Sequence, residues 1–104
     1  MLNSVNMVGK IKDGLVIKET ANGLQYGQFT IEVDRSYKKS DSSKDHDTFM
    51  VTVWRSLLES LQGVQTGSFI SLQGRLADNN FVKDDGSVSY KVDIVADRIE
   101  CLSR

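Results

Sequence analysis

Residues 29–34 read FTIEVD, and this stretch decides the fold. Its apolar residues, Phe29, Ile31 and Val33, alternate with polar ones, which is the period of a strand with one face on a core. Aromatic and β-branched residues such as these favour strands. The pattern predicts a long strand over residues 24–37, and similar residues recur along the chain, so the sequence predicts an all-β fold.

Four further strands are expected from the same residue types, at residues 5–20, 48–55, 69–76 and 88–102. Glycines at Gly9 and Gly14 predict bends in the first strand, as when one strand serves both sheets of a barrel. Asn22-Gly23 and Asp85-Gly86 are hairpin-turn signals. Residues 38–47 form a polar loop, in which His46 is expected to be a solvated loop residue.

A single short helix is expected at residues 56–61, where Leu57, Leu58 and Leu61 supply an apolar face. Ser56 followed by Glu59 three residues later predicts a capping box at its start. Five strands with one helix between the third and fourth predict a Greek-key OB-fold barrel. Another small barrel or a half-sandwich fits the same pattern.

The composition describes one domain, residues 1–104, with the 39% hydrophobic and 26% charged residues of an ordinary globular protein. A net charge of −1 argues against nucleic-acid binding but does not exclude it, because local clusters matter more than the sum. The chain has neither a membrane-length apolar run nor a secretion signal, so a cytoplasmic location is expected. The chain has a single cysteine, Cys101, and a single histidine, His46. With so few such side chains, we expect no metal site, no cofactor and no catalytic activity.

Aromatic residues near cations are the remaining candidates for chemistry. Tyr37, Trp54 and Phe81 stand near the cations Arg35, Lys38, Lys39, Arg55 and Lys83. A ring that stacks on a base beside cations that hold phosphates suits single-stranded nucleic acid, although such rings are often core residues. Because Val51 and Val53 read as core, strand parity predicts that Phe49 faces inward and Trp54 outward.

The whole chain resembles the bacterial single-stranded DNA-binding proteins. The segments that carry the resemblance are MLN at 1–3, VGK at 8–10, FTI at 29–31, VDRSY at 33–37, VWR at 53–55, GRL at 74–76, DG at 85–86 and VAD at 95–97. The resemblance implies an OB fold, a homodimer or tetramer, and sequence-nonspecific binding of single-stranded DNA in replication, recombination and repair. It places stacking roles on Tyr37, Trp54 and Phe81, and a fourth near Phe49.

This sequence also departs from the family pattern. Phe49 precedes Trp54 by five residues where the family has six, and the family's cations are replaced by Ser4 and Asn79. The cations expected on the DNA path are Lys10, Lys12, Arg35, Lys38, Lys39, Arg55, Arg75 and Lys83.

The family's members usually continue into an acidic tail that is absent from this sequence, so we expect either a shortened form or a tailless relative such as the primosomal protein PriB. A PriB-like adaptor for helicase-loading partners is therefore an alternative, although the helix at residues 56–61 favours the DNA-binding branch. Edge-to-edge contact through Val5, Met7 and Val8 is expected to join the subunits.

Overall fold

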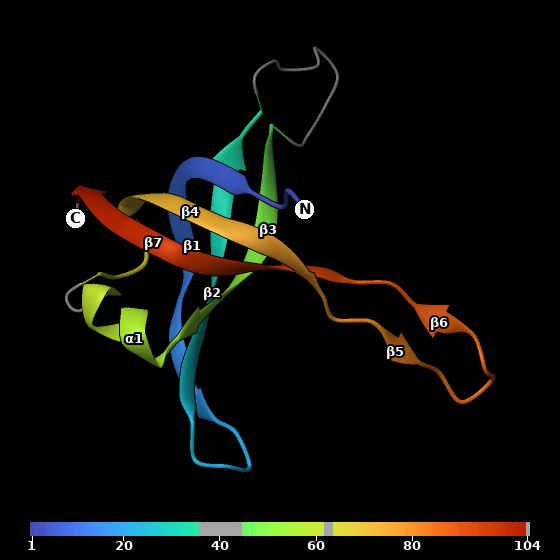
Figure 1. Cartoon of the computed structure of the whole chain (residues 1–104). Helices are drawn as coiled ribbons and strands as arrows, with labels where there is room; N and C mark the ends of the chain where they lie inside the picture. Colours follow the sequence, from blue (N-terminus) through green and yellow to red (C-terminus); the bar gives the residue numbers. More distant parts are fainter. Residues whose placement is uncertain (36–44, 62–63, 104) are drawn as a thin grey trace.

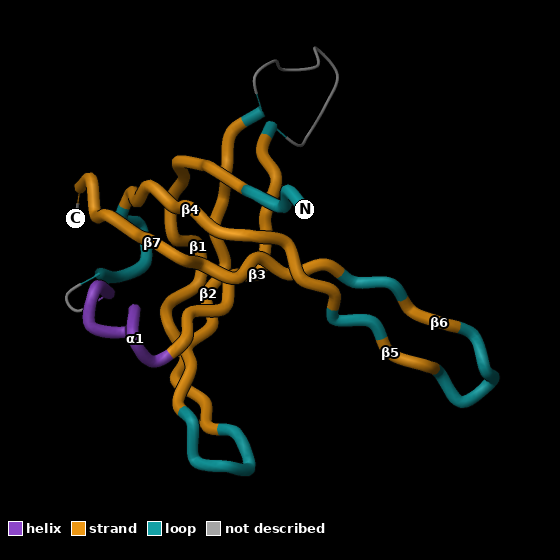
Figure 2. The backbone as a smooth tube through the Cα atoms, viewed as in Figure 1, coloured by secondary structure: helices purple, strands orange, loops and turns teal. Residues whose placement is uncertain are grey.

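The computed structural model describes residues 1–35, 45–61 and 64–103. Five strands close into a barrel in the order β1-β2-β3-β7-β4, with antiparallel neighbours except for the parallel pair β3 and β7 (Figures 1 and 2). The barrel strands are β1 (Val5–Glu19), β2 (Gln25–Asp34), β3 (His46–Trp54), β4 (Phe69–Asp78) and β7 (Val92–Ser103). The predicted OB fold is confirmed, including the helical segment between β3 and β4.

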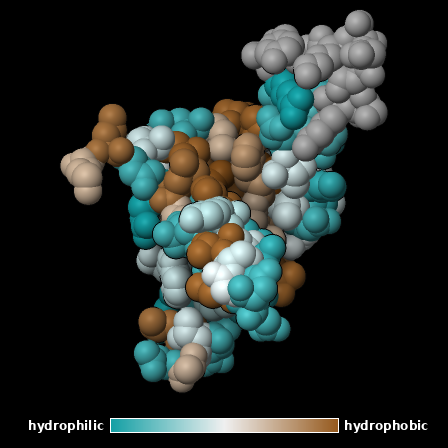
Figure 3. Space-filling view, turned by 90° about the vertical axis from the view of Figure 1, so that its right-hand side faces the viewer, coloured by the Kyte–Doolittle hydropathy of each residue, from teal (hydrophilic) through white to brown (hydrophobic). Residues whose placement is uncertain are grey.

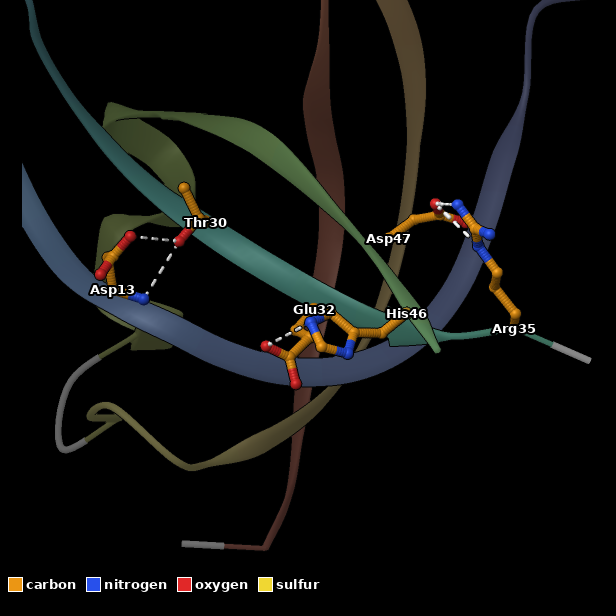
Figure 4. Close-up of polar contacts among 6 residues, drawn as sticks. All are labelled: Asp13, Thr30, Glu32, Arg35, His46 and Asp47. Carbon is orange, nitrogen blue, oxygen red and sulfur yellow. Dashed lines mark hydrogen bonds and ion pairs between the residues drawn. The ribbon is translucent and has the colours of Figure 1, made fainter. Parts of the chain in front are cut away.

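β1 wraps around the barrel, pairing with β4 through Val5–Lys10 and with β2 from Lys10 onward. Its register against β2 shifts on both sides of Asp13, next to the predicted bend at Gly14. At this position the Asp13 N–H bonds to a side chain: it donates to Thr30 Oγ1 at 3.0 Å. The Thr30 hydroxyl in turn donates to Asp13 Oδ2 at 2.9 Å (Figure 4). The irregular stretch lets one strand join both sides of the closed barrel.

The barrel interior holds the alternating apolar residues that the sequence pattern predicted. Phe29 and Ile31 of β2 and Val51 and Val53 of β3 are all buried. The remaining buried apolar residues are Ile11, Leu61, Ile70, Leu72, Ile94, Ala96 and Ile99. In β2 and β4 the buried residues alternate with less buried ones, and these less buried residues form an outer surface that is available for binding.

The helical segment begins one residue earlier than expected and is capped differently. α1 spans Arg55–Leu58 and is followed by the 3₁₀ turn η1, Glu59–Leu61. Its N-cap is Trp54, which makes no side-chain capping bond, so the predicted capping box at Ser56 is wrong. The reason is that β3 runs directly into the helix, which leaves Ser56 inside the first turn.

Beyond the barrel, β4 and β7 continue into a two-stranded arm (residues 79–91) that contains β5 (Phe81–Val82) and β6 (Val88–Ser89). The arm projects from the barrel and turns at Gly86, whose φ is +87° (Figure 1). The single last strand predicted over residues 88–102 is therefore divided. It breaks where the Asn80 side chain accepts a hydrogen bond from the Lys91 N–H at 2.9 Å, in place of a backbone carbonyl.

His46 is the first residue of β3, so the prediction of a loop histidine is wrong. It pairs across the sheet with Asp34, and its Nε2 lies 3.4 Å from Glu32 Oε2 (Figure 4). The sequence did not predict this position, because His46 has acidic and polar neighbours and the alternation of apolar and polar residues in β3 does not reach it. No helix among the described residues is long and apolar enough to cross a membrane.

Candidate nucleic-acid interface

Two aromatic rings form a pair on the outer face of the barrel. Tyr26 of β2 and Trp54 of β3 are directly opposite each other, and their ring centroids lie 5.1 Å apart at an interplanar angle of 40°. Their strand neighbours Gly27 and Val53 are buried, which directs both rings outward. Trp54 keeps 41% of its surface exposed, so the predicted outward orientation is confirmed. The two tilted rings offer an aromatic surface to a ligand.

The arm carries the second exposed ring of the interface, Phe81. The Lys91 ammonium lies 5.2 Å from the Phe81 ring centroid, within cation–π range. Phe81 pairs with Ser89, so alternation places Tyr90 on the opposite face of the arm. Figure 3 views the molecule from the side on which the arm projects and shows hydrophobic side chains (brown) among hydrophilic ones (teal) on that side. One face of the arm therefore carries the Phe81 ring with the Lys91 cation above it, and the opposite face carries Tyr90.

A groove of about 290 Å³ lies between the ring pair and the root of the arm. Its lining residues come from five segments of the chain: Thr20, Tyr26, Gln28, Thr52, Trp54, Ala77, Asp78, Asn79, Asp93 and Val95. The Gln28 amide crosses its floor and donates to Thr52 Oγ1 at 3.3 Å, while the Lys18 ammonium donates to the Gln28 carbonyl at 2.8 Å. These bonds explain why Thr52 is buried although it lies on the outward side of β3.

The predicted cations are distributed over several places. Arg55 lines a depression beside Trp54, Arg75 pairs with Val95 next to the groove, and Lys83 lies in the exposed arm. Lys10 is half-buried and lines a separate depression with Glu32, Asp34 and Phe69. The structure thus brings Arg55, Arg75 and Lys83 to the segments that carry the exposed rings or line the groove. Lys10 shares no depression with those rings.

Arg35 and Lys12 are placed differently from those three cations. Arg35 donates to Asp47 Oδ1 from both Nε, at 3.1 Å, and Nη2, at 2.8 Å, so its charge is already paired (Figure 4). Lys12 is exposed on β1. An engaged arginine offers less to a phosphate than a solvated one, because the ion pair must first be broken.

The strand register confirms the predicted orientation of Phe49, and its role as a base contact stays a prediction. The register is unbroken, so Phe49 shares its side of β3 with Val51 and Val53 as parity predicts. It pairs with the fully buried Ile31 and is itself 38% exposed, so the described residues cover this inward-facing side chain only in part. Tyr37, Lys38 and Lys39 lie outside the described residues.

Sequence reasoning missed two members of this interface, Tyr26 and Lys91. Tyr26 has the parity of Gln28 and Thr30, the polar side of β2, and this was the available signal for an exposed ring. Lys91 lies ten residues from Phe81 on the other side of a hairpin. The Asp85-Gly86 turn between them was the sequence feature that could have predicted their proximity.

The turn at the tip of the arm is held by one carboxylate. Asp85 Oδ1 accepts from the Ser87 hydroxyl at 2.6 Å and from the Ser87 N–H at 2.9 Å. The hydroxyl bond foremost, and the backbone bond after it, lower the pKa of the Asp85 carboxyl below its ordinary value. Within the described ranges, no group of three or more His, Cys, Asp or Glu side chains could hold a metal ion.

A closed barrel of this strand order with a helix between β3 and β4 is an OB fold, and its outer face carries the exposed rings. The sequence profile of the Single-strand binding protein family matches residues 2–102. The chain belongs to this family, whose members are binding proteins rather than enzymes.

Curated relatives agree with this membership. The chain is 27% identical to "Single-stranded DNA-binding protein 1" of Streptococcus pyogenes serotype M18, over 100% of this chain and 81% of that protein. It is 30% identical to the "Single-stranded DNA-binding protein" of Oceanobacillus iheyensis, over 98% of this chain and 64% of that protein. Among solved structures, "Plasmodium falciparum SSB complex with ssDNA" superposes with a TM-score of 0.81 over 99% of this chain and 97% of that one, at 14% identity. That last likeness supports the fold.

Proposed function

We propose that this protein binds single-stranded DNA by stacking bases on exposed aromatic rings, without recognising a defined sequence. The observation that carries the proposal is the outward Tyr26–Trp54 ring pair on the barrel face of a chain in the single-strand binding protein family. Rings of this kind are buried in most small domains, so leaving Trp54 41% exposed has a cost that a ligand offsets.

The chemistry divides between rings and cations. Every base has a π face, so stacking on Trp54 and Phe81 contributes about 1–3 kcal/mol per base with little regard to its identity. Arg55, Arg75 and Lys91 supply positive charge along the same surface, and phosphate contacts of this type carry no sequence information. Tyr37, Lys38, Lys39, Lys83, Phe49, Lys10, Lys12 and Arg35 are proposed as further contacts on the strength of the family resemblance. The proposed setting is DNA replication, recombination and repair in the cytoplasm.

The arm provides a matched pair of variants to test this proposal. Phe81→Ala removes the ring that stands under Lys91, whereas Tyr90→Ala removes a more exposed ring from the opposite face. We expect Phe81→Ala to weaken binding of a dT oligomer about tenfold at constant salt, and Tyr90→Ala to change it less than twofold. Equal losses in the two variants would contradict the stacking role of Phe81.

We propose that the protein is a homo-oligomer joined through the first half of β1. Residues 5–8 pair with β4 along one edge, and the described pairing with β2 starts only at Lys10, so their other edge has no strand neighbour among the described residues. The adjoining outer face carries the exposed Val8 and a depression of about 490 Å³ beside Met7. An open edge with apolar neighbours suits addition of the same strand from a second copy, giving a dimer.

Val8→Glu and Val16→Glu test the proposed interface. Both valines lie in β1 and both are 55% exposed, but Val16 lies in the half that is paired with β2. In sedimentation equilibrium, we expect Val8→Glu to shift the protein toward monomer and Val16→Glu to leave the oligomer intact. A monomeric wild-type protein would refute the proposed contact.

A further inference from the structure

The groove between the ring pair and the root of the arm has an acidic rim. Asp78 and Asn79 approach it from the end of β4, and Asp93 approaches it from β7. Neither lysine nor arginine is among its lining residues. The most aromatic part of the surface therefore lies beside two negative charges, which is an unfavourable place for a phosphate.

Among the residues that the structure describes, nothing is bonded to the two carboxylates of this rim. Within residues 1–35, 45–61 and 64–103, neither the Asp78 nor the Asp93 side chain makes a hydrogen bond or an ion pair. The Gln28 amide and the Thr52 hydroxyl on the groove floor, in contrast, are bonded to each other, and Gln28 also to Lys18. The two carboxylates are the only charged side chains among the described residues that line this groove, and they are acceptors that cannot donate.

An ionised carboxylate only accepts hydrogen bonds, so it selects ligands by their donors. Cytosine and adenine present an exocyclic amine, and guanine presents an N–H and an amine side by side. Thymine and uracil have a carbonyl in place of cytosine's amine, so their one donor on this edge is the ring N3–H, which lies between two carbonyl oxygens that repel a carboxylate. Acidic side chains that accept from the amine of cytosine are a known form of base readout.

We propose that this groove is a base-selective subsite, in which a base stacked on the open face of Trp54 donates its exocyclic amine to Asp93 or Asp78. The subsite favours amine-bearing bases over thymine and uracil. The inference rests on the proposed binding of single-stranded DNA and adds a preference in base composition to it, not a recognised sequence. Asp93 is the stronger acceptor candidate because it is half-buried, whereas Asp78 is exposed.

Homopolymers of deoxycytidine and deoxyuridine of equal length provide the cleanest probe. Their bases are both pyrimidines without a methyl group, and they differ at position 4, an amine against a carbonyl, and at the adjacent N3, which carries a hydrogen only in uracil. At neutral pH and constant salt, we expect the wild-type protein to bind the cytosine oligomer about fivefold tighter than the uracil oligomer.

Asp93→Asn is the test variant and Asp97→Asn its control. Asp97 lies in the same strand, is exposed and does not line the groove, and both changes remove one negative charge. Both variants therefore strengthen phosphate attraction similarly, and the cytosine-to-uracil affinity ratio isolates the base contact. We expect the ratio to fall toward one in Asp93→Asn, whose amide also donates to the uracil carbonyl, and to stay about fivefold in Asp97→Asn.

Circular dichroism establishes that each variant is folded, and Asp78→Asn gives a second reading of the ratio if Asp93→Asn does not fold. A wild-type ratio near one, or a ratio unchanged in Asp93→Asn and Asp78→Asn, overturns the inference while leaving the proposed function intact. Absence of binding to either oligomer at low salt overturns both.

Discussion

Trp54→Ala removes the larger ring of the outward pair and should weaken DNA binding with a limited effect on folding. Stacking of one base on an aromatic side chain is worth about 1–3 kcal/mol, or about 5- to 140-fold in Kd. One face of Trp54 is turned toward Tyr26, at 5.1 Å, so a single base can use the other. We therefore expect the lower half of that range, a Kd raised about tenfold for a dT oligomer.

The stability change follows from the same contact. An aromatic pair is worth about 0.5–1.5 kcal/mol beyond its buried area, and Trp54 is already 41% exposed, so we expect unfolding to become easier by about 1–2 kcal/mol. Fluorescence anisotropy of a labelled oligomer measures Kd, and urea denaturation followed by circular dichroism measures stability. Trp54→Phe is the control, because it keeps a ring and should recover most of the affinity. A folded Trp54→Ala protein that binds within twofold of the wild type would refute the reasoning.

Three other predictions concern the barrel crossing, the charge on the arm and the turn at its tip. Gly9→Ala places a Cβ 2.6 Å from the Glu32 carbonyl oxygen, so we expect urea denaturation to show a free energy of unfolding lower by about 1–3 kcal/mol. An unchanged free energy of unfolding would show that the strands separate easily at this point. Lys91→Ala should reduce the slope of the logarithm of the DNA-binding constant against the logarithm of the salt concentration by about 0.7, the value for one phosphate contact on a single strand. An unchanged slope would show that Lys91 contacts the Phe81 ring and no phosphate. Ser87→Ala should raise the pKa of Asp85 toward its ordinary value in an NMR titration. Because the folded-state pKa is lowered, the hydrogen bonds of Asp85 stabilise the turn at neutral pH, and this stability is lost as the pH falls below the ordinary value. In Ser87→Ala, the stability of the turn should depend much less on pH over this range.

Local patterns predicted the barrel well because its strands bury every second residue. Phe29 and Ile31 in β2 and Val51 and Val53 in β3 follow that rule, and Gly23 and Gly86 adopt positive φ in the expected turns. The rule concerns the side of a strand and not its depth in the barrel. It therefore placed Phe49 on the correct side and could not show that this residue keeps 38% of its surface exposed.

The interface was less predictable because its members meet across strands. Tyr26 and Trp54 are 28 positions apart in the sequence, and their contact depends on the β2–β3 register. The groove joins residues from the β1–β2 hairpin, β3 and the root of the arm, and sequence patterns do not report how orthogonal strands cross. The capping box failed for a related reason, since β3 passes into α1 without a separate cap.

Trp54 is the single tryptophan of the chain, so intrinsic fluorescence reports on the proposed stacking site itself. The most direct measurement is a titration with a dT oligomer that follows this emission and the anisotropy of a labelled oligomer in parallel. The account predicts that the emission is quenched with the same midpoint at which the oligomer becomes bound. Binding by anisotropy with unchanged tryptophan emission would contradict the claim that bases stack on the outward ring pair.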